Sequence, residues 1–255
     1  MSAPTWLVLG ASSSIARAFA LEAAAQGCNV ILAGRDRDDL DRGASDIRIR
    51  HNVAVTAVDF DAEAVDTHDA FVREVTGSSA GFGGSGASGP LNVFLAFGLM
   101  PDQSAIDADP DKAQRTIMAT YAGAVSILHR LAPILEAQGS GHVVALGSVA
   151  GDRGRIKNYV YGSAKAGLHA YLQGLRNRLF RSGVTVTTVK PGFIDTTMTW
   201  GMPGLFLVAS PQACARACLR YAAKGAEVRY FPVFWWIIMT IIRSIPEPIF
   251  KRLSI

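Results

Sequence analysis

The chain has 255 residues, of which 49% are hydrophobic and 18% are charged, so it can bury one sizeable core as a single α/β domain. Its net charge of +4 is scattered along the chain and forms no basic stripe, which excludes nucleic acid as an expected partner. Three cysteines at no metal-ligand spacing predict no metal site, no disulfide framework and a reducing, cytoplasmic location.

Short apolar runs alternate with longer helix-like segments along most of the chain, which begins without the pattern of a secretory signal. Runs rich in valine, leucine and isoleucine are typical of parallel strands buried on both faces, and their alternation with helices indicates βαβ units. We therefore predict an α/β fold with one Rossmann-type, doubly wound parallel sheet of about seven strands, in a catalytic domain over residues 1–229. The predicted strands are Trp6–Leu9, Asn29–Ala33, Val53–Val58, Leu91–Phe97, His142–Leu146 and Val184–Val189.

The first strand runs into a turn of small residues at the start of an alanine-rich helix. Small side chains let the backbone approach a pyrophosphate, and the free amides and dipole of a helix N-terminus attract its negative charge. The turn therefore predicts dinucleotide binding, although an ordinary tight turn stays open because only one true glycine is present. The predicted contacts are Gly10, Ser12, Ser13, Ser14 and Ile15.

The second strand is followed directly by Arg35 and Asp36. An acidic residue at this strand end would bind the ribose 2′-hydroxyl of NAD, whereas an arginine pairs with the 2′-phosphate of NADP. Arg35 therefore favours NADP(H) over NAD(H). Asp36 leaves the alternative open, since either residue can instead be a solvated charge at the start of the next helix.

Residues 76–90, between the third and fourth strands, are dense in glycine and serine. Such a segment cannot bury enough apolar surface to order itself, so we predict a mobile surface loop. An interdomain linker is the less favoured alternative, because the strand pattern continues immediately afterwards.

The strongest indication of chemistry is the set Ser148, Tyr161 and Lys165. Ser148 follows a predicted strand, which places it at the sheet edge where open α/β folds bind ligands. Tyr161 and Lys165 are four residues apart in a helix-compatible stretch, so they share one helix face.

A tyrosine with a pKa of about 10 is a poor proton relay at neutral pH, but a nearby cation stabilises the phenolate and lowers that pKa. We therefore predict Tyr161 as the proton donor and Lys165 as the cation that lowers its pKa and also holds ribose hydroxyls. Ser148 is expected to bind the substrate oxygen while hydride arrives from a nicotinamide.

The small-residue turn and the Tyr-x-x-x-Lys motif, with a serine thirteen residues before the tyrosine, resemble the short-chain dehydrogenase/reductase family over essentially the whole chain. The resemblance implies an NAD(P)-dependent oxidoreductase acting on alcohol or carbonyl groups. A helix cap at Asp59 and a simple turn at Pro191 are the alternatives for two of the contacts it implies. Those contacts are Asp59, Phe60, Ala96, Phe97, Gly98, Tyr161, Lys165, Pro191, Gly192, Ile194 and Thr196.

The chain departs from the pattern of that family at several positions, among them Leu95-Ala-Phe-Gly98, where the family usually has Asn-Asn-Ala-Gly. Ser14 and Ala16 occupy the second and third glycine positions of the turn, and Thr120 stands where the family has a catalytic asparagine that holds a water beside the lysine. We place Thr120 in that catalytic role, although its hydroxyl offers fewer hydrogen-bonding groups than an amide. These departures keep open a non-catalytic dinucleotide-binding sensor or scaffold as an alternative function.

The last segment, residues 230–255, is predicted to be an apolar helical tail. Its uncharged run from Phe231 to Ile242 would be about 18 Å long as a helix, well short of a hydrocarbon core of about 30 Å. Peripheral contact with the inner face of a membrane and burial in a homo-oligomer interface are equally favoured. The residues suited to a membrane interface are Trp235, Trp236, Arg243, Lys251 and Arg252.

Three segments, Phe97–Met100, Tyr159–Gly167 and Ile245–Ile255, more narrowly resemble family members that reduce decaprenylphosphoryl-2-keto-erythro-pentose. This resemblance implies a keto sugar linked to a polyprenyl phosphate as the substrate. Another apolar ketone or alcohol stays open as the substrate. The short segment after the sixth strand is apolar, which suits a long hydrophobic substrate but does not identify one. Its apolar residues are Met198, Trp200, Met202, Leu205 and Phe206.

Overall fold

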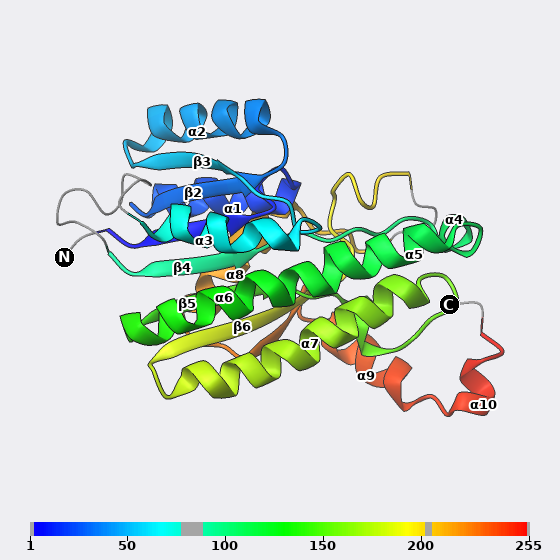
Figure 1. Cartoon of the computed structure of the whole chain (residues 1–255). Helices are drawn as coiled ribbons and strands as arrows, with labels where there is room; N and C mark the ends of the chain where they lie inside the picture. The colour runs from blue at the N-terminus through cyan, green and yellow to red at the C-terminus, as the bar shows by residue number, and fades with distance from the viewer. Residues whose placement is uncertain (1–2, 78–88, 202–205, 254–255) are drawn as a thin grey trace.

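The computed structural model describes residues 3–77, 89–201 and 206–253. Its seven strands form one parallel sheet in the order β3-β2-β1-β4-β5-β6-β7, with helices on both faces (Figure 1). The predicted α/β, doubly wound fold is therefore confirmed. The strands are β1 (Thr5–Leu9), β2 (Asn29–Gly34), β3 (Val55–Asp59), β4 (Leu91–Leu95), β5 (Gly141–Leu146), β6 (Val184–Pro191) and β7 (Val228–Phe231).

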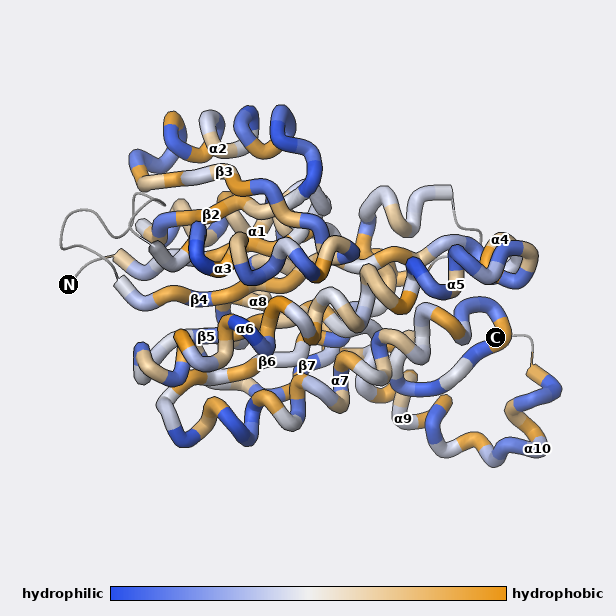
Figure 2. Tube along the Cα trace, viewed as in Figure 1, coloured by the Kyte–Doolittle hydropathy of each residue, from blue (hydrophilic) through white to orange (hydrophobic). Residues whose placement is uncertain are grey.

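The strands form where short runs of β-branched and aliphatic residues can be buried from both sides. Every residue of β1 is buried, and the hydropathy colouring in Figure 2 is mostly hydrophobic along the central strands. The predicted boundaries differ at two strands. β3 begins at Val55 rather than Val53, and β4 ends at Leu95, so that Ala96 and Phe97 leave the sheet at its carboxyl edge.

Two hydrophobic cores fill the space between the sheet and its helices. One lies under α1 (Ser14–Ala25), α2 (Arg37–His51) and α8 (Pro211–Ala223), and the other under α3, α6 and α7. The remaining helical elements are α3 (His68–Thr76), α6 (Gly123–Gln138), α7 (Tyr159–Phe180), η1 (Val65–Thr67), α4 (Gln103–Asp107), α5 (Pro110–Ile117), η3 (Met118–Ala122) and η4 (Val149–Asp152).

One described helical segment, Pro110–Gln138, is long and apolar enough to cross a bilayer by those two criteria alone. It comprises α5, the π-helical turn η3 and α6. Its α6 part buries Ile127, Leu128 and Leu131 in the core beside the sheet. Length and composition are therefore weak evidence for a membrane span here.

The C-terminal segment packs along the body of the protein. β7 pairs with β6 and includes Tyr230 and Phe231, the first residues assigned to the tail by sequence. α9 (Trp235–Ser244) buries Trp235 and Met239 in a small core with Val149, and α10 (Glu247–Phe250) follows it at the lower right of Figure 1.

Arg153 attaches this segment to the loop after β5. Its guanidinium donates hydrogen bonds to the backbone carbonyls of Ile242, Arg243 and Ile245, and also to the Glu247 carboxylate. The inner face of α9 is thus covered by the protein itself, while Trp236, Ile237 and Ile241 on its outer face are exposed.

Two sequence predictions fall on residues that the structure does not describe. Most of the predicted glycine- and serine-rich loop, residues 78–88, lies outside the described ranges. The same holds for Met202 and Leu205 of the apolar segment after β6.

Candidate active site

A cavity of about 1000 Å³ opens at the carboxyl ends of the strands. Ligands of open α/β sheets bind at this edge, and the volume is of the size that cofactor and ligand pockets have. Most of the residues singled out by sequence line it. They are Gly10, Ser12, Ser13, Ser14, Ile15, Arg35, Phe60, Ala96, Phe97, Gly98, Ser148, Tyr161, Lys165, Pro191, Gly192, Ile194 and Thr196.

The nucleotide end of the cavity is the turn between β1 and α1. Ser13 caps α1 by accepting a hydrogen bond from the Ala16 amide at 3.2 Å. Gly10 has a φ of +81°, and a Cβ on it would lie 2.9 Å from the Phe97 Cβ, so only glycine fits. A close-packed backbone at a helix N-terminus is the geometry that a pyrophosphate requires. The residues present therefore fit a dinucleotide.

Arg35 and Asp36 at the end of β2 have separate surroundings. The exposed Arg35 lines the cavity, 3.7 Å from Glu63, whereas the Asp36 carboxylate caps α2 by accepting a hydrogen bond from the Asp39 amide. The helix-start role that sequence left open for either residue therefore falls to Asp36. Arg35 is the residue that faces the cavity from this strand end.

Ser148, Tyr161 and Lys165 meet at the end of β5. Ser148 begins η4, where its hydroxyl accepts a hydrogen bond from the Ala150 amide at 3.0 Å. Tyr161 and Lys165 are both buried on the first turns of α7. The Lys165 Nζ donates to the Leu146 carbonyl at 2.8 Å and lies 5.8 Å from the centre of the Tyr161 ring.

Burial controls the ionisation of both α7 side chains. It raises the pKa of the Tyr161 phenol to about 12, with a hydrogen bond to Ser148 as the smaller, opposing cause. It also lowers the pKa of Lys165 to about 8. From the sequence we expected Lys165 to lower the pKa of Tyr161, whereas loss of solvation raises it. The phenol is therefore protonated at neutral pH, the form that donates a proton.

Two predicted site residues lie outside the cavity wall. Thr120 is buried on η3, and its hydroxyl accepts from the Leu99 amide and donates to the Leu99 carbonyl. Gly98 lies beside both this hydroxyl and the lysine, since a Cβ on it would lie 3.5 Å from both Thr120 Oγ1 and Lys165 Nζ. The structure thus uses the Thr120 hydroxyl to hold the loop after β4.

Asp59 ends β3 with its side chain 73% exposed, 4.0 Å from Arg37. The alternative that Asp59 caps the next helix is wrong, because η1 begins at Val65 with Ala64 at its N-cap position. The cofactor contact that the family resemblance implies for Asp59 stays a prediction.

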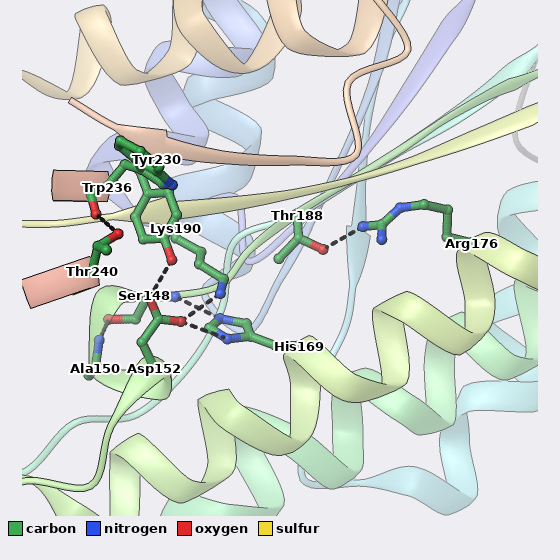
Figure 3. A network of polar contacts seen from close by, with 10 residues as sticks. All are labelled: Ser148, Ala150, Asp152, His169, Arg176, Thr188, Lys190, Tyr230, Trp236 and Thr240. Carbon is green, nitrogen blue, oxygen red and sulfur yellow. Dashed lines mark hydrogen bonds and ion pairs between the residues drawn. The ribbon is translucent and has the colours of Figure 1, made fainter. Parts of the chain in front are cut away.

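A buried polar network beneath Ser148 was not predicted (Figure 3). The Asp152 carboxylate accepts hydrogen bonds from Lys190 Nζ at 2.5 Å and from the Tyr230 hydroxyl at 2.6 Å. His169 Nδ1 lies 3.7 Å from the same carboxylate, and His169 Nε2 accepts from the Ser148 amide at 3.3 Å. The network therefore joins Ser148 to β6, α7 and β7.

His169 is neutral within this network. Burial, with help from the nearby Lys190 ammonium, lowers its pKa to about 3. The unprotonated Nε2 is therefore available to accept the amide hydrogen of Ser148. One signal could have indicated this network, since Asp152 and Lys190 both lie beside segments that carry predicted site residues.

Three residues of the loop between Ser148 and Tyr161 were not predicted as part of the site. Arg155, Lys157 and Asn158 line the same cavity. Their position between two predicted catalytic residues was a signal that could have identified them. Among the described residues no group of histidine, cysteine, aspartate or glutamate side chains could hold a metal, and the three cysteines are free and buried.

Comparisons with known sequences agree with this geometry. The family model for short chain dehydrogenases matches residues 4–203. An uncharacterised oxidoreductase of Mycobacterium tuberculosis is 32% identical over 248 residues, covering 97% of this chain and 96% of the relative. An uncharacterised oxidoreductase of Streptomyces coelicolor is 33% identical over 253 residues, covering 98% of this chain and 95% of the relative.

Solved structures have the same fold. A short-chain dehydrogenase/reductase family protein matches with a TM-score of 0.77 at 25% identity, over 90% of this chain and 95% of that one. L-Sorbose reductase from Gluconobacter frateurii, solved with NADPH and L-sorbose, has a TM-score of 0.76 at 20% identity over 90% and 95%. A short-chain dehydrogenase from Sphingobium yanoikuyae, in complex with NADPH, has a TM-score of 0.74 at 24% identity, over 96% of this chain and 97% of that one.

Proposed function

The chain belongs to the short-chain dehydrogenase/reductase family of oxidoreductases, and we propose that it uses NADPH to reduce a ketone to an alcohol, with Tyr161 as the proton donor. The observation that carries this proposal is the buried, protonated Tyr161 beside Ser148 and Lys165 in a strand-end cavity.

Purified protein should consume NADPH with some members of a panel of free and lipid-linked ketones. Saturable cofactor binding without turnover on any of them would favour the sensor alternative.

The cavity residues divide between the two halves of the cofactor. In this proposal the Gly10 turn holds the pyrophosphate, Arg35 holds the 2′-phosphate, and the segment from Pro191 to Thr196 holds the nicotinamide. The NADPH complexes of similarly folded proteins support the choice of cofactor. When bound, NADPH supplies the hydride that reduces the carbonyl carbon.

The chain's own groups manage the proton. The Ser148 oxygen accepts from the Ala150 amide, and its hydroxyl faces the Tyr161 phenol, so its hydrogen can turn to the substrate oxygen when the substrate binds. Tyr161 donates its proton to that oxygen as negative charge develops there. Lys165 has used one of its three donors on Leu146 and stabilises the resulting phenolate through its charge.

Replacing Arg35 with alanine is expected to weaken NADPH binding about 10- to 100-fold, the loss typical of a charge-assisted hydrogen bond to phosphate. Affinity for NADH should stay nearly unchanged, because it lacks the 2′-phosphate. Titration calorimetry with both cofactors measures this difference. Arg37→Ala is the matched control, since Arg37 is half-exposed and pairs with Asp41. Equal losses for both cofactors, or turnover with NADH alone, would overturn the assignment of Arg35.

For the substrate we propose an amphiphilic ketone, such as a keto sugar linked to a polyprenyl phosphate. Part of the cavity wall is apolar and open, with Met198, Trp200 and Phe206 all exposed to solvent. Such a wall suits the apolar portion of a substrate beside the Tyr161 hydroxyl. The named reductase of similar fold acts on a ketose, which agrees with a polyhydroxy ketone at the reacting end.

We also propose that residues 230–255 rest on a membrane surface as an appendage of the catalytic domain, residues 1–229. The outer side of α9 and α10 exposes Trp236, Ile237, Ile241 and Ile249. Exposed Arg243, Lys251 and Arg252 flank this side and would meet anionic headgroups. A second copy of the chain, giving a homo-oligomer, is the competing occupant.

Ile241→Asp should reduce binding to anionic phospholipid vesicles about 10- to 100-fold, because burying one isoleucine contributes about 1.5–3 kcal/mol. Vesicle co-sedimentation measures the binding, and turnover of a water-soluble ketone should be retained. Ile49→Asp is the control, since Ile49 is 85% exposed on α2. Wild-type protein that ignores vesicles but forms dimers in light scattering would assign this side to a subunit contact instead.

A further inference from the structure

The loop between Ser148 and Tyr161 brings a basic group into the cavity. Arg155, Lys157 and Asn158 all line it together with Tyr161. Arg155 Nε and Asn158 Oδ1 are buried and have no hydrogen-bond partner among the described residues. Buried polar atoms without partners are costly, so a polar group of a water or a ligand is expected to satisfy them.

The carboxylates around Arg155 are engaged elsewhere. Asp152, the acid whose charge acts on Arg155, accepts hydrogen bonds from Lys190 and Tyr230. Glu63, which lines the cavity near Arg35, holds Arg115 through both of its oxygens. Two further acids, Asp61 and Asp102, line the cavity, and within the described ranges neither lies within ion-pair distance of Arg155. Among the described residues, Arg155 therefore feels the charge of Asp152 but forms no ion pair of its own.

Position separates this loop from the phosphate sites of the cofactor. The pyrophosphate turn follows β1 and Arg35 follows β2, whereas Arg155 follows β5. In the sheet, β4 lies between β1 and β5, and β2 lies on the far side of β1. Arg155 instead accompanies Ser148 and Tyr161, the groups assigned to the reacting carbonyl. Arg155 therefore lies at the reacting end of the cavity rather than at the phosphate sites of the cofactor.

From this arrangement we propose that Arg155 and Asn158 form a subsite for an anionic group on the keto substrate, either a phosphate ester or a carboxylate. The inference rests on the proposed reductase function and names its substrate class. The planar guanidinium of Arg155 suits a two-pronged hydrogen bond to such an oxyanion. Asn158 Oδ1 accepts a hydroxyl hydrogen of the substrate, and the exposed Lys157 adds positive charge at the cavity wall.

Three matched probes test the subsite: a straight-chain methyl ketone ending in an alcohol, the phosphate monoester of that alcohol, and the corresponding carboxylate. Calorimetry on the NADP⁺-loaded protein gives their affinities without turnover, and NADPH consumption gives kcat/KM. The wild type should prefer one or both anionic probes over the alcohol by about 10- to 100-fold in affinity. A preference for the phosphate alone identifies a phosphate ester, and one for the carboxylate alone identifies a keto acid.

Arg155→Met should abolish that preference by lowering the affinity for the anionic probes to that for the alcohol, and Arg155→Lys should retain part of it. Asn158→Asp, of nearly the same shape, provides a second test, because its added negative charge should repel both anions. Arg48→Met on the exposed side of α2 controls for loss of an arginine. A wild type that treats all three probes alike, or variants that keep the preference, would overturn the subsite. Absent turnover with Arg155-dependent anion binding would instead overturn only the reductase function.

Discussion

Replacing Tyr161 with phenylalanine is expected to lower NADPH-dependent ketone reduction by about 10²- to 10⁴-fold, the contribution typical of a positioned proton donor. The ring is buried, and the substitution removes only the hydroxyl, so packing around α7 should be preserved. Cofactor affinity should therefore change little. Steady-state kinetics measures the loss, and fluorescence titration with NADPH measures the binding.

Which kinetic constants the Tyr161→Phe substitution lowers is also informative. A group that acts as charge develops on the substrate oxygen should lower kcat and kcat/KM together. Tyr159→Phe is a matched control on the same helix, since its hydroxyl bonds Asp107 and its side chain does not line the cavity. Turnover in Tyr161→Phe equal to that of the wild type would remove Tyr161 from the mechanism.

Replacing Lys190 with methionine is expected to destabilise the protein by about 3–5 kcal/mol, because it leaves a buried carboxylate without its cation. Only 2% of the Asp152 side chain and 12% of the Lys190 side chain are exposed. His169 cannot replace the missing charge, since burial keeps it neutral at physiological pH. Urea unfolding of the variant and the wild type measures the difference in the free energy of unfolding.

The double variant Asp152→Asn with Lys190→Met removes both charges and should recover most of that loss. Lys112→Met is the surface control, because Lys112 and Asp109 form an exposed ion pair, for which about 1 kcal/mol or less is expected. If Lys190→Met and Lys112→Met destabilised the protein equally, the network would not be the support of Ser148 that its contacts indicate.

The sequence predicted the sheet well because its strands are buried on both faces and appear as continuous apolar runs. β7 was not located, since Val228–Phe231 is a short, half-buried edge strand that merges with the apolar residues after it. The apolar tail was recognised from composition. Its attachment was not, because the hydrogen bonds of Arg153 join residues about ninety positions apart.

Local spacing placed Ser148, Tyr161 and Lys165 at one edge of the sheet, since strand ends and helix periodicity both follow from local sequence. Local spacing did not predict that the pKa of Tyr161 is raised, because burial depends on the packing of the whole domain. The network of Asp152, Lys190 and His169 escaped for the same reason, since its members come from η4, β6 and α7.

The close contact at Gly192 likewise depends on tertiary structure. The Pro191-Gly192 pair was assigned to a turn or a cofactor contact by sequence. In the structure a Cβ on Gly192 would lie 1.9 Å from the indole nitrogen of Trp235, so the absence of a side chain lets α9 pack against the cavity wall. Such a constraint appears only when β6 and α9 are brought together.

Transfer of deuterium tests the central claim most directly. Purified protein is given NADPH that carries deuterium at its transferable position, together with an amphiphilic ketone, and the product is analysed by mass spectrometry and NMR. The proposed function predicts an alcohol with one deuterium on the former carbonyl carbon, formed in equal amount to the NADP⁺ released. Oxidation of NADPH without deuterium in the product, or saturable NADPH binding without alcohol formation from any ketone tested, would contradict it.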